Sequence, residues 1–269
     1  GEHLSKLDFP TDGESVDHAA RRFRYVYDTY LRNAGTKTYL SVIPDKNTFI
    51  ASQNGYPDKD YKALTERLRS GFPEAKYIDI SGLLSADDFY YTDSHWRQER
   101  ITKVADEIAA QMGAERIGTC EIQDTGRPFY GVYYGQAALP HAPERLFYLD
   151  NAVIRGLKVY NVETQSDIPV YDLGAAAGRD PYEMFLGGAR SIIKITNPNA
   201  AQERRLIVFR DSFGSSIAPL LAAGYSEITL VDIRYISPLS LGKLIDFTKA
   251  DDVLFLYSAS VINNSETIK

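Results

Sequence analysis

Helical and strand-like patterns alternate in two separate blocks of this chain. In the first block, apolar residues recur at helical spacing over residues 14–34 and 101–112, with short strand-like runs between them. In the second block, residues 206–209 are all apolar, as in a buried parallel strand, and a sharp turn and a helix follow them. This alternation predicts a layered α/β domain with a mostly parallel sheet. We expect helices at 14–34, 58–71, 101–112, 213–223 and 238–250, and strands at 38–44, 75–80, 206–209, 226–235 and 251–260.

The segment between the two blocks has a different character. Residues 117–200 are rich in Gly, Pro and Tyr, and their apolar runs are short. Such a pattern is typical of irregular, β-rich structure, and the Pro- and Gly-dense stretch RDPYEMFLGGAR predicts an ordered loop. We therefore expect one domain over residues 1–269, in which residues 117–200 are a β-rich insertion or subdomain.

Bulk properties exclude several classes of protein. The formal net charge of -6 disfavours nucleic acid as a partner, because phosphate binding requires a basic surface. No apolar run is long enough to span a membrane. The single cysteine, Cys120, excludes an internal disulfide and a cysteine-based metal cluster. The first residues, GEHLSKLDFP, lack an initiator Met and a signal segment, so we interpret the chain as one whose natural beginning, with a signal or anchor, is not included.

The stretch YYTDSHWRQER, residues 90–100, places Asp93 and His95 two positions apart just before a periodic helix. Two interpretations are open. Thr92, Asp93 and Ser94 are all good residues for capping the start of that helix. An aspartate beside a histidine is also half of a Ser-His-Asp triad.

Ser212 is a candidate for the other half of a triad. It follows the apolar strand 206–209 and precedes a helix, which is where open α/β sheets bind their ligands. A histidine can activate a serine there, although Ser212 could also simply cap the helix. Of the four histidines, His3 lies near the terminus, His18 in the first helix and His141 between prolines. Only His95 lies at a β–α junction beside an aspartate.

The order of the elements resembles that of the SGNH or GDSL hydrolases after a rotation of the chain. When the sequence is read from residue 205 through the C-terminus and then from residue 36, the serine motif follows the first strand. The Asp–His motif then opens the last helix, as it does in those hydrolases. The chain would be a circular permutation of that order, with residues 117–200 bridging its two parts.

Three sequence blocks, YYTDSHW, VFRDSFGSSIAPLL and ITLVDIRY, resemble the DHHW family of bacterial proteins. They are also similar to the permuted SGNH-like domains of the alginate O-acetylation proteins. The resemblance covers residues 36–112 and 205–265, and Ser94 stands where the DHHW pattern has its first histidine. It implies an SGNH-hydrolase-like, three-layer α/β sandwich with a mostly parallel, circularly permuted sheet and a β-rich insertion.

Carried onto this sequence, the resemblance implies Ser212 as nucleophile, His95 as general base and Asp93 as the carboxylate that orients it. An acyl-serine would pass its acetyl group to water or to a sugar hydroxyl. The Ser212 backbone N–H would contribute to an oxyanion hole.

Further binding residues are expected near the ends of later strands. Tyr235 and either Asn263 or Asn264 are candidates for the oxyanion hole, although SASVINNS departs from the motif that SGNH relatives use there. Arg210 could bind an anionic group of the substrate, or it could pair with a carboxylate at the sheet edge. Trp96 is expected to pack beneath the site.

The sequence contains no motif that indicates another kind of chemistry. It has no phosphate-binding loop, no Gly-x-Ser-x-Gly elbow and no paired-histidine zinc helix. The acidic stretch SADDFYYTD has no regular metal-ligand spacing, so we predict no metal and no cofactor.

The sequence thus predicts a serine-dependent carbohydrate esterase or O-acetyltransferase that acts on a bacterial polysaccharide or cell-wall glycan outside the cytoplasm. A membrane-bound partner that donates the acyl group is an expected extension of this hypothesis. The alternative is a non-catalytic carbohydrate-binding or assembly module on the same scaffold.

Overall fold

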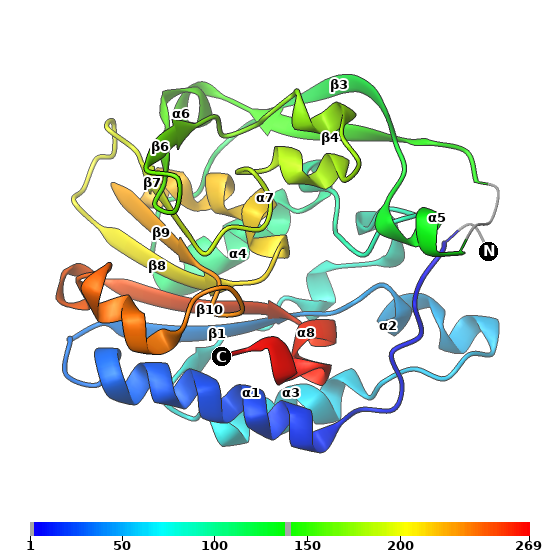
Figure 1. The fold of residues 1–269 in the computed structure, drawn as a ribbon, viewed down its shortest axis with the longest axis horizontal. Helices are drawn as coiled ribbons and strands as arrows, with labels where there is room; N and C mark the ends of the chain where they lie inside the picture. Colours follow the sequence, from blue (N-terminus) through cyan, green and yellow to red (C-terminus); the bar gives the residue numbers. More distant parts are fainter. Residues whose placement is uncertain (1–2, 138–140) are drawn as a thin grey trace.

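An eight-stranded sheet forms the middle layer of the structure, a computed structural model that describes residues 3–137 and 141–269 (Figure 1). The first five strands across the sheet pair in parallel, and the last three pair antiparallel. The predicted α/β fold with a mostly parallel sheet is therefore confirmed. The order across the sheet is β2 (Lys76–Tyr77), β1 (Lys37–Ile43), β10 (Asp252–Ser258), β8 (Arg205–Arg210), β9 (Glu227–Val231), β7 (Ile192–Thr196), β5 (Lys158–Asn161) and β6 (Ser166–Ile168).

The parallel strands are permuted along the chain. Counting from β8 through β9 and β10, and then from β1 to β2, gives these strands the numbers 1 to 5 and the spatial order 2-1-3-4-5. That order belongs to one of the common doubly wound α/β folds. The last strand in the chain, β10, therefore lies in the middle of the parallel part, between β1 and β8.

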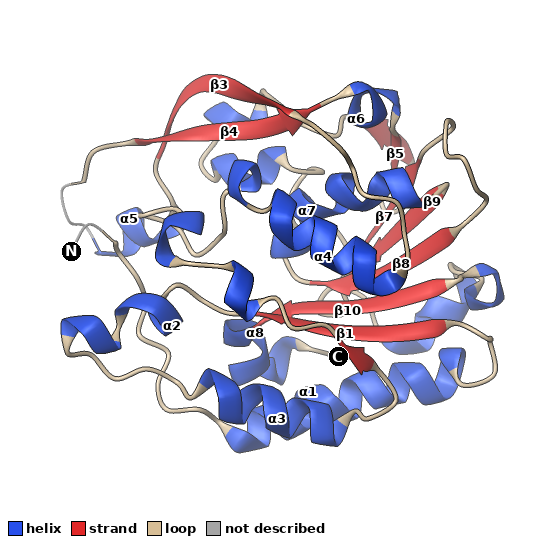
Figure 2. Ribbon diagram, turned by 180° about the vertical axis from the view of Figure 1, so that it is seen from behind, coloured by secondary structure: helices blue, strands red, loops and turns tan. Residues whose placement is uncertain are grey.

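Helices cover both faces of the sheet (Figures 1 and 2). On one face lie α1 (Gly13–Val26), α3 (Tyr61–Gly71) and α8 (Ala259–Asn263), and on the other lie α4 (Thr102–Met112) and α7 (Phe213–Leu221). The strand side chains alternate between the two cores, so Phe255 of β10 packs with α1 while Leu254 and Leu256 pack with α4 and α7. This double burial explains why β10 is apolar along nearly its whole length.

Local signals account for the ends of the main helices. The Asp12 side chain accepts the N–H groups of Glu14 and Ser15 at the start of α1. The Asp60 side chain accepts an N–H in the first turn of α3. Gly113 ends α4 with a φ of 68°, a left-handed conformation that glycine adopts without strain.

The segment 117–200 contributes to two sheets. Strands β3 (Glu121–Phe129) and β4 (Glu144–Asp150) form a separate antiparallel pair beyond the layer of α4 and α7 (Figure 1). Strands β5, β6 and β7 extend the large sheet next to β9. Side chains of this segment form a small third core with Tyr90. The remaining short helices are α2 (Asn47–Ile50), α5 (Val132–Ala137) and α6 (Ala152–Gly156).

The prediction of a helix over residues 238–250 is wrong. The structure has two 3-10 turns there, Pro238–Lys243 and Phe247–Lys249, and no α-helix. The Asp246 side chain accepts the Thr248 N–H and so starts the second turn separately. Asp246 favours such local bonding over the interior of a helix, which explains why the apolar spacing alone was misleading.

Candidate active site

Ser212 lies between the end of strand β8 and the first residue of helix α7. The Asp211 carboxylate fixes this turn, because it accepts the Phe213 N–H at 3.1 Å and the Ser258 N–H at 2.7 Å. Ser258 is the last residue of β10, so the turn is tied to the neighbouring strand. The strand order reverses between β8 and β10, and ligands of open α/β sheets bind outside such a point.

The segment with Asp93 and His95 is a turn rather than the start of a helix. A 3-10 turn at Gln98–Arg100 follows it, and α4 begins only at Thr102. The capping prediction for residues 92–94 is therefore wrong, because these residues lie too far before the helix. Instead, Asp93 Oδ1 accepts the backbone N–H of His95 at 2.9 Å, a local bond that aspartate forms readily and that sets the direction of the imidazole.

Asp93, His95 and Ser212 form one chain of hydrogen bonds. The Nδ1 atom of His95 lies 2.5 Å from Asp93 Oδ1, and its Nε2 atom lies 2.7 Å from Ser212 Oγ. His95 and Ser212 are separated by 117 residues in the sequence, so only the tertiary fold brings them together. This arrangement has the geometry in which a histidine can take a proton from a serine while a carboxylate holds the ring. The three catalytic roles remain predictions.

The charge of Asp93 decides which nitrogen of His95 carries the proton. Burial alone raises the pKa of Asp93, but the neighbouring His95 and the N–H donors of His95 and Val132 outweigh it and lower the pKa to about 2. The ionised carboxylate can only accept hydrogen bonds, so His95 Nδ1 is the donor to it. In the neutral imidazole the Nε2 atom is then the acceptor for the Ser212 hydroxyl, which is the tautomer that a general base requires.

The low pKa of Asp93 makes the free energy of unfolding depend on pH in the acidic range. The Asp93 carboxyl group has a pKa of about 2 in the folded state, against an ordinary pKa of 3.8. It therefore stabilises the fold at pH values above 3.8, and this contribution disappears as the pH falls through about 2. We expect the stability advantage of the wild type over Asp93→Asn to shrink by about 2 kcal/mol between about pH 5 and pH 2. Urea unfolding of both proteins across this range measures the change, and an advantage that stays constant would contradict it.

Comparison with known proteins identifies the family. The sequence model described as DHHW protein matches residues 84–231, more than half of the chain, and this range contains Asp93, His95 and Ser212. The chain belongs to the DHHW family. The resemblance expected from the three sequence blocks is thereby confirmed. No curated protein matches the chain in sequence.

Solved structures share the fold of this DHHW protein. A DHHW family protein from Eubacterium siraeum has a TM-score of 0.74 at 18% identity, over 99% of this chain and 89% of that one. Bacillus cereus PatB1 with a sulfonyl adduct has a TM-score of 0.76 at 18% identity, over 96% and 93%. The O-acetyltransferase domain of Pseudomonas putida AlgJ has a TM-score of 0.55 at 14% identity, over 93% and 84%. At these identities the likeness shows the fold.

The other predicted site residues of this DHHW protein have different surroundings. Arg210 is fully buried, and its guanidinium donates to the carbonyls of Asp211 and Arg190 and lies 3.9 Å from the Asp232 carboxylate. Of the two interpretations of Arg210, these contacts favour the one in which it pairs with a carboxylate at the sheet edge. Tyr235 lies in the loop after β9 and is 52% exposed.

Asn263 joins helix α8 to the N-terminal segment. Its Oδ1 atom accepts the Asp12 N–H at 2.7 Å, and its Nδ2 atom donates to Asp8 and to the Pro10 carbonyl. Asn264 Nδ2 also donates to Asp8. Both amide nitrogens are therefore occupied by contacts within the protein.

Trp96 packs beneath the candidate site, as expected. The indole is fully buried, and its Nε1 atom donates to Ser216 Oγ at 2.8 Å. Its ring meets Phe213 edge to face, with 5.3 Å between the centroids. Trp96 thus connects the turn that carries His95 to the helix that follows Ser212.

Two buried charges that the sequence analysis missed hold the Asp93 turn. Lys46 Nζ donates to the carbonyls of Tyr90, Tyr91 and Asp93 at 2.8 to 2.9 Å. The Glu144 carboxylate accepts the N–H groups of Tyr91 and Thr92 at 2.8 Å, and also the Thr92 hydroxyl. A buried ion requires such partners to offset the loss of water. The backbone of the turn is thus fixed from both sides.

Of these two residues, only Lys46 could have been noticed from the sequence. Lys46 follows β1 at the carboxyl end of a parallel strand, the same position in the fold that identified Ser212. Glu144 begins β4 in the irregular segment, where no periodic pattern indicates what it contacts.

Gly131 is required by the close approach of its backbone to the Asp93 turn. A Cβ atom there would lie 2.3 Å from Asp93 Cβ and 2.4 Å from the Thr92 carbonyl oxygen. We therefore expect Gly131→Ala to destabilise the protein by about 1–3 kcal/mol, because the turn must move to make room. Thermal unfolding measures the loss.

Gly135, in helix α5, provides a matched control for Gly131. A Cβ atom at Gly135 would have no neighbour within 4 Å, and alanine favours a helix. Gly135→Ala should leave the unfolding temperature unchanged or raise it. Equal destabilisation by both substitutions would contradict the explanation by close approach.

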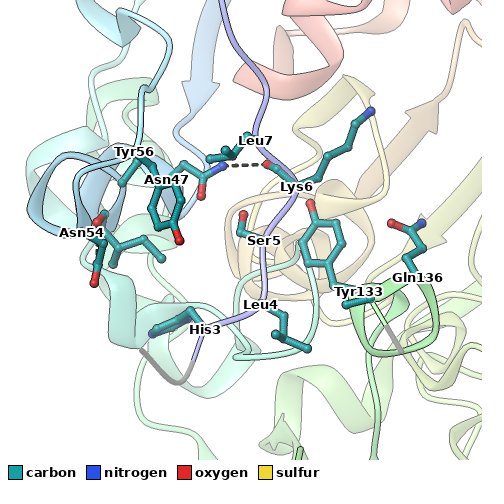
Figure 3. Close-up of a pocket in the computed structure, with 13 residues that line it drawn as sticks. His3, Leu4, Ser5, Lys6, Leu7, Asn47, Asn54, Tyr56, Tyr133 and Gln136 are labelled. Carbon is teal, nitrogen blue, oxygen red and sulfur yellow. Dashed lines mark hydrogen bonds between the residues drawn. The ribbon is translucent and has the colours of Figure 1, made fainter. Parts of the chain in front are cut away.

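The structure contains a cavity of about 600 Å³ (Figure 3). Its walls come from the N-terminal segment, from α2 and the turn after it, and from α5. Tyr133 in its wall donates its N–H to the Thr92 carbonyl, and its ring lies 5.1 Å from Lys46 Nζ. None of Asp93, His95 and Ser212 lines this cavity.

Within residues 3–137 and 141–269, no three His, Cys, Asp or Glu side chains come together as a metal site. Among the helices in that part of the chain, none combines the length and the apolar character needed to cross a membrane.

Proposed function

We propose that this DHHW protein is a serine-dependent carbohydrate esterase or O-acetyltransferase that works through an acyl-serine intermediate. The observation that carries the proposal is the hydrogen-bonded series from Ser212 Oγ to His95 Nε2 and from His95 Nδ1 to Asp93. Such a series makes a serine hydroxyl nucleophilic at neutral pH. A binding module would not need it.

The first half of the reaction acylates the serine. Ser212 Oγ attacks the carbonyl carbon of an acetyl donor while His95 Nε2 takes the hydroxyl proton. The ionised Asp93 stabilises the imidazolium that forms. When the tetrahedral intermediate collapses, the bond to the donor oxygen breaks, and His95 returns the proton to that leaving group. The acetyl group is then bonded to Ser212.

The second half transfers the acetyl group. Water or a sugar hydroxyl loses its proton to His95 Nε2 and attacks the acetyl carbon, and Ser212 Oγ leaves and regains that proton. The Ser212 N–H donates to no acceptor in the part of the chain that the structure describes. It is therefore free to donate to the oxyanion of each tetrahedral intermediate.

The substrate and the location are part of the proposal. The AlgJ domain that shares the fold is described as an O-acetyltransferase, and the sequence blocks resemble the alginate O-acetylation proteins. We therefore place a bacterial polysaccharide or cell-wall glycan at the site, outside the cytoplasm. A membrane-bound partner would supply the acetyl group in the cell, and an activated ester replaces it in the test tube.

Trapping of the intermediate tests the proposal. The protein is mixed with p-nitrophenyl acetate, quenched and digested, and mass spectrometry should find one acetyl group on the peptide that contains Ser212. In a second sample that is not quenched, a mixture of uronate and N-acetylglucosamine oligomers added with the ester should yield acetylated sugar if the enzyme is a transferase, and free acetate if it is an esterase.

A fluorophosphonate probe covers the case in which the activated ester reacts poorly. It should label Ser212 irrespective of any acyl-donor partner, because it needs only an activated serine. If neither acetyl nor phosphonyl label is found on Ser212, the enzyme proposal is overturned, and the non-catalytic glycan-binding module becomes the better hypothesis.

A further inference from the structure

An aromatic ring from the 117–200 segment lies flat against the His95 imidazole. The ring belongs to Tyr182, in the 3-10 turn Pro181–Met184. The centroids of the two rings are 3.8 Å apart, and their planes differ by only 10°. Phe213, the residue after Ser212, also contacts the imidazole, at 4.8 Å and 49°. Aromatic side chains thus enclose His95, whose edge remains bonded to Asp93 and Ser212.

The hydroxyl of Tyr182 ties its ring to helix α7. It donates to Ser216 Oγ at 2.7 Å, and Ser216 in turn donates to the Phe213 carbonyl at 3.3 Å. Ser216 also accepts the Trp96 Nε1–H at 2.8 Å. One serine hydroxyl therefore links the stacked ring, the residue beside His95 and the first turn after the nucleophile.

The segment around Tyr182 holds the ring in place from the other side. The Asp180 side chain accepts the Tyr182 N–H at 3.2 Å and starts the turn. Phe185 packs on the Tyr182 ring at 4.9 Å, within a small core that also contains Tyr90 and Phe129. Only 4% of Tyr182 is exposed, and burial raises its pKa well above the ordinary value, so the phenol stays neutral.

We propose that Tyr182 is a positioning residue for the general base: its ring fixes the plane of the His95 imidazole and stabilises the imidazolium that forms when Ser212 is deprotonated. The inference rests on the proposed function. A cation over the face of an aromatic ring is attracted by the negative face of the π system. A ring held against the imidazole also prevents rotation away from Ser212, which preserves the alignment needed for proton transfer.

The variants Tyr182→Leu and Tyr182→Phe separate the ring from the hydroxyl. Tyr182→Leu removes the stacked face, and we expect kcat for p-nitrophenyl acetate to fall by about 10- to 100-fold while KM changes little. Fluorophosphonate labelling of Ser212 should slow by a similar factor. Tyr182→Phe keeps the face, and both rates should stay within a few-fold of the wild type.

Tyr171 offers a control from the same segment. Its hydroxyl donates to the Leu149 carbonyl at 2.8 Å, and its ring meets Phe185 edge to face, but it does not touch the triad. Tyr171→Leu should cost stability without slowing Ser212 labelling. A loss of rate in Tyr171→Leu as large as that in Tyr182→Leu would assign the effect to packing and overturn the proposal.

Nuclear magnetic resonance tests the stack without any assay of activity. The His95 imidazole stacks on the Tyr182 ring with 3.8 Å between the centroids. We therefore expect the resonance of its Cε1–H proton to be shifted upfield in the wild type and in Tyr182→Phe, and to return downfield in Tyr182→Leu. His95→Gln assigns the signal. This readout distinguishes failure of the positioning role from failure of the proposed function, since the latter would show as unchanged ester hydrolysis in Ser212→Ala.

Besides the Tyr171→Leu result, two others overturn the positioning role. The first is wild-type kcat and labelling rate in a folded Tyr182→Leu protein whose upfield shift is lost. The second is a loss of rate in Tyr182→Phe as large as that in Tyr182→Leu, which would assign the effect to the hydroxyl rather than to the ring.

Discussion

Ser212→Ala is expected to lose at least about 10³-fold in kcat for an activated acetyl ester, and up to about 10⁶-fold if the serine and histidine act as a unit. The reason is that no covalent intermediate can form without Oγ. Only the oxyanion donors and substrate binding then remain to lower the barrier. The hydroxyl is small and makes one side-chain hydrogen bond, to His95, so the fold should survive its loss. Release of p-nitrophenol measures the rate, and thermal unfolding confirms the fold.

A control serine shows that the effect belongs to position 212. Ser52 is exposed in the turn after α2, away from the triad. Ser52→Ala should therefore keep the wild-type rate. Equal rates in Ser212→Ala and the wild type would remove the serine from the mechanism, whatever the geometry at the site.

His95→Ala is expected to cost nearly as much as Ser212→Ala. Without the imidazole, the Ser212 hydroxyl has no base, and at neutral pH it is a poor nucleophile. Asp93 would also be left buried with fewer donors, so some loss of stability should accompany the loss of rate. The double variant with Ser212→Ala should be no slower than either single variant, because residues that act as a unit are not additive. Three rate measurements on one ester settle this comparison.

His18 is a matched control for His95. It also forms a histidine–serine pair, with its Nδ1 atom 3.0 Å from Ser265 Oγ, but on helix α1, in the opposite helical layer. His18→Ala should keep the wild-type rate. A double variant much slower than both single variants would show that His95 and Ser212 act independently, contrary to the triad.

Much of the fold could be predicted from sequence because helices and strands follow local patterns, and the same patterns located the turns that carry Asp93, His95 and Ser212. The apolar spacing in α1, α3 and α4 and the apolar strands β8 and β10 each reflect burial on a defined face. Their alternation places the serine turn at the carboxyl edge of a parallel sheet. The count of four histidines then left few partners for Ser212.

The rest of the site depends on contacts that no local pattern specifies. Tyr182 and Glu144 come from an irregular segment, and their neighbours are set by how that segment folds back over α4 and α7. Lys46 could have been noticed by its place after β1, but nothing local shows that its ammonium turns toward three carbonyl groups. Side-chain capping near residues 92–94 was misjudged because an aspartate that bonds its own turn and one that caps a helix look the same in sequence.

The place of β10 in the sheet has a consequence for when the candidate site is assembled during synthesis. The turn with Asp93 follows β2, whereas Ser212 follows β8, and β10 lies between β1 and β8. Because the ribosome makes β10 after both of its neighbours, β1 and β8 lack the strand that pairs with each of them until β10 has been made. The turn with Ser212 therefore lacks its tie to β10, the hydrogen bond from the Ser258 N–H to Asp211, until that strand has emerged. We therefore expect the candidate site to be among the last parts of the fold to be completed.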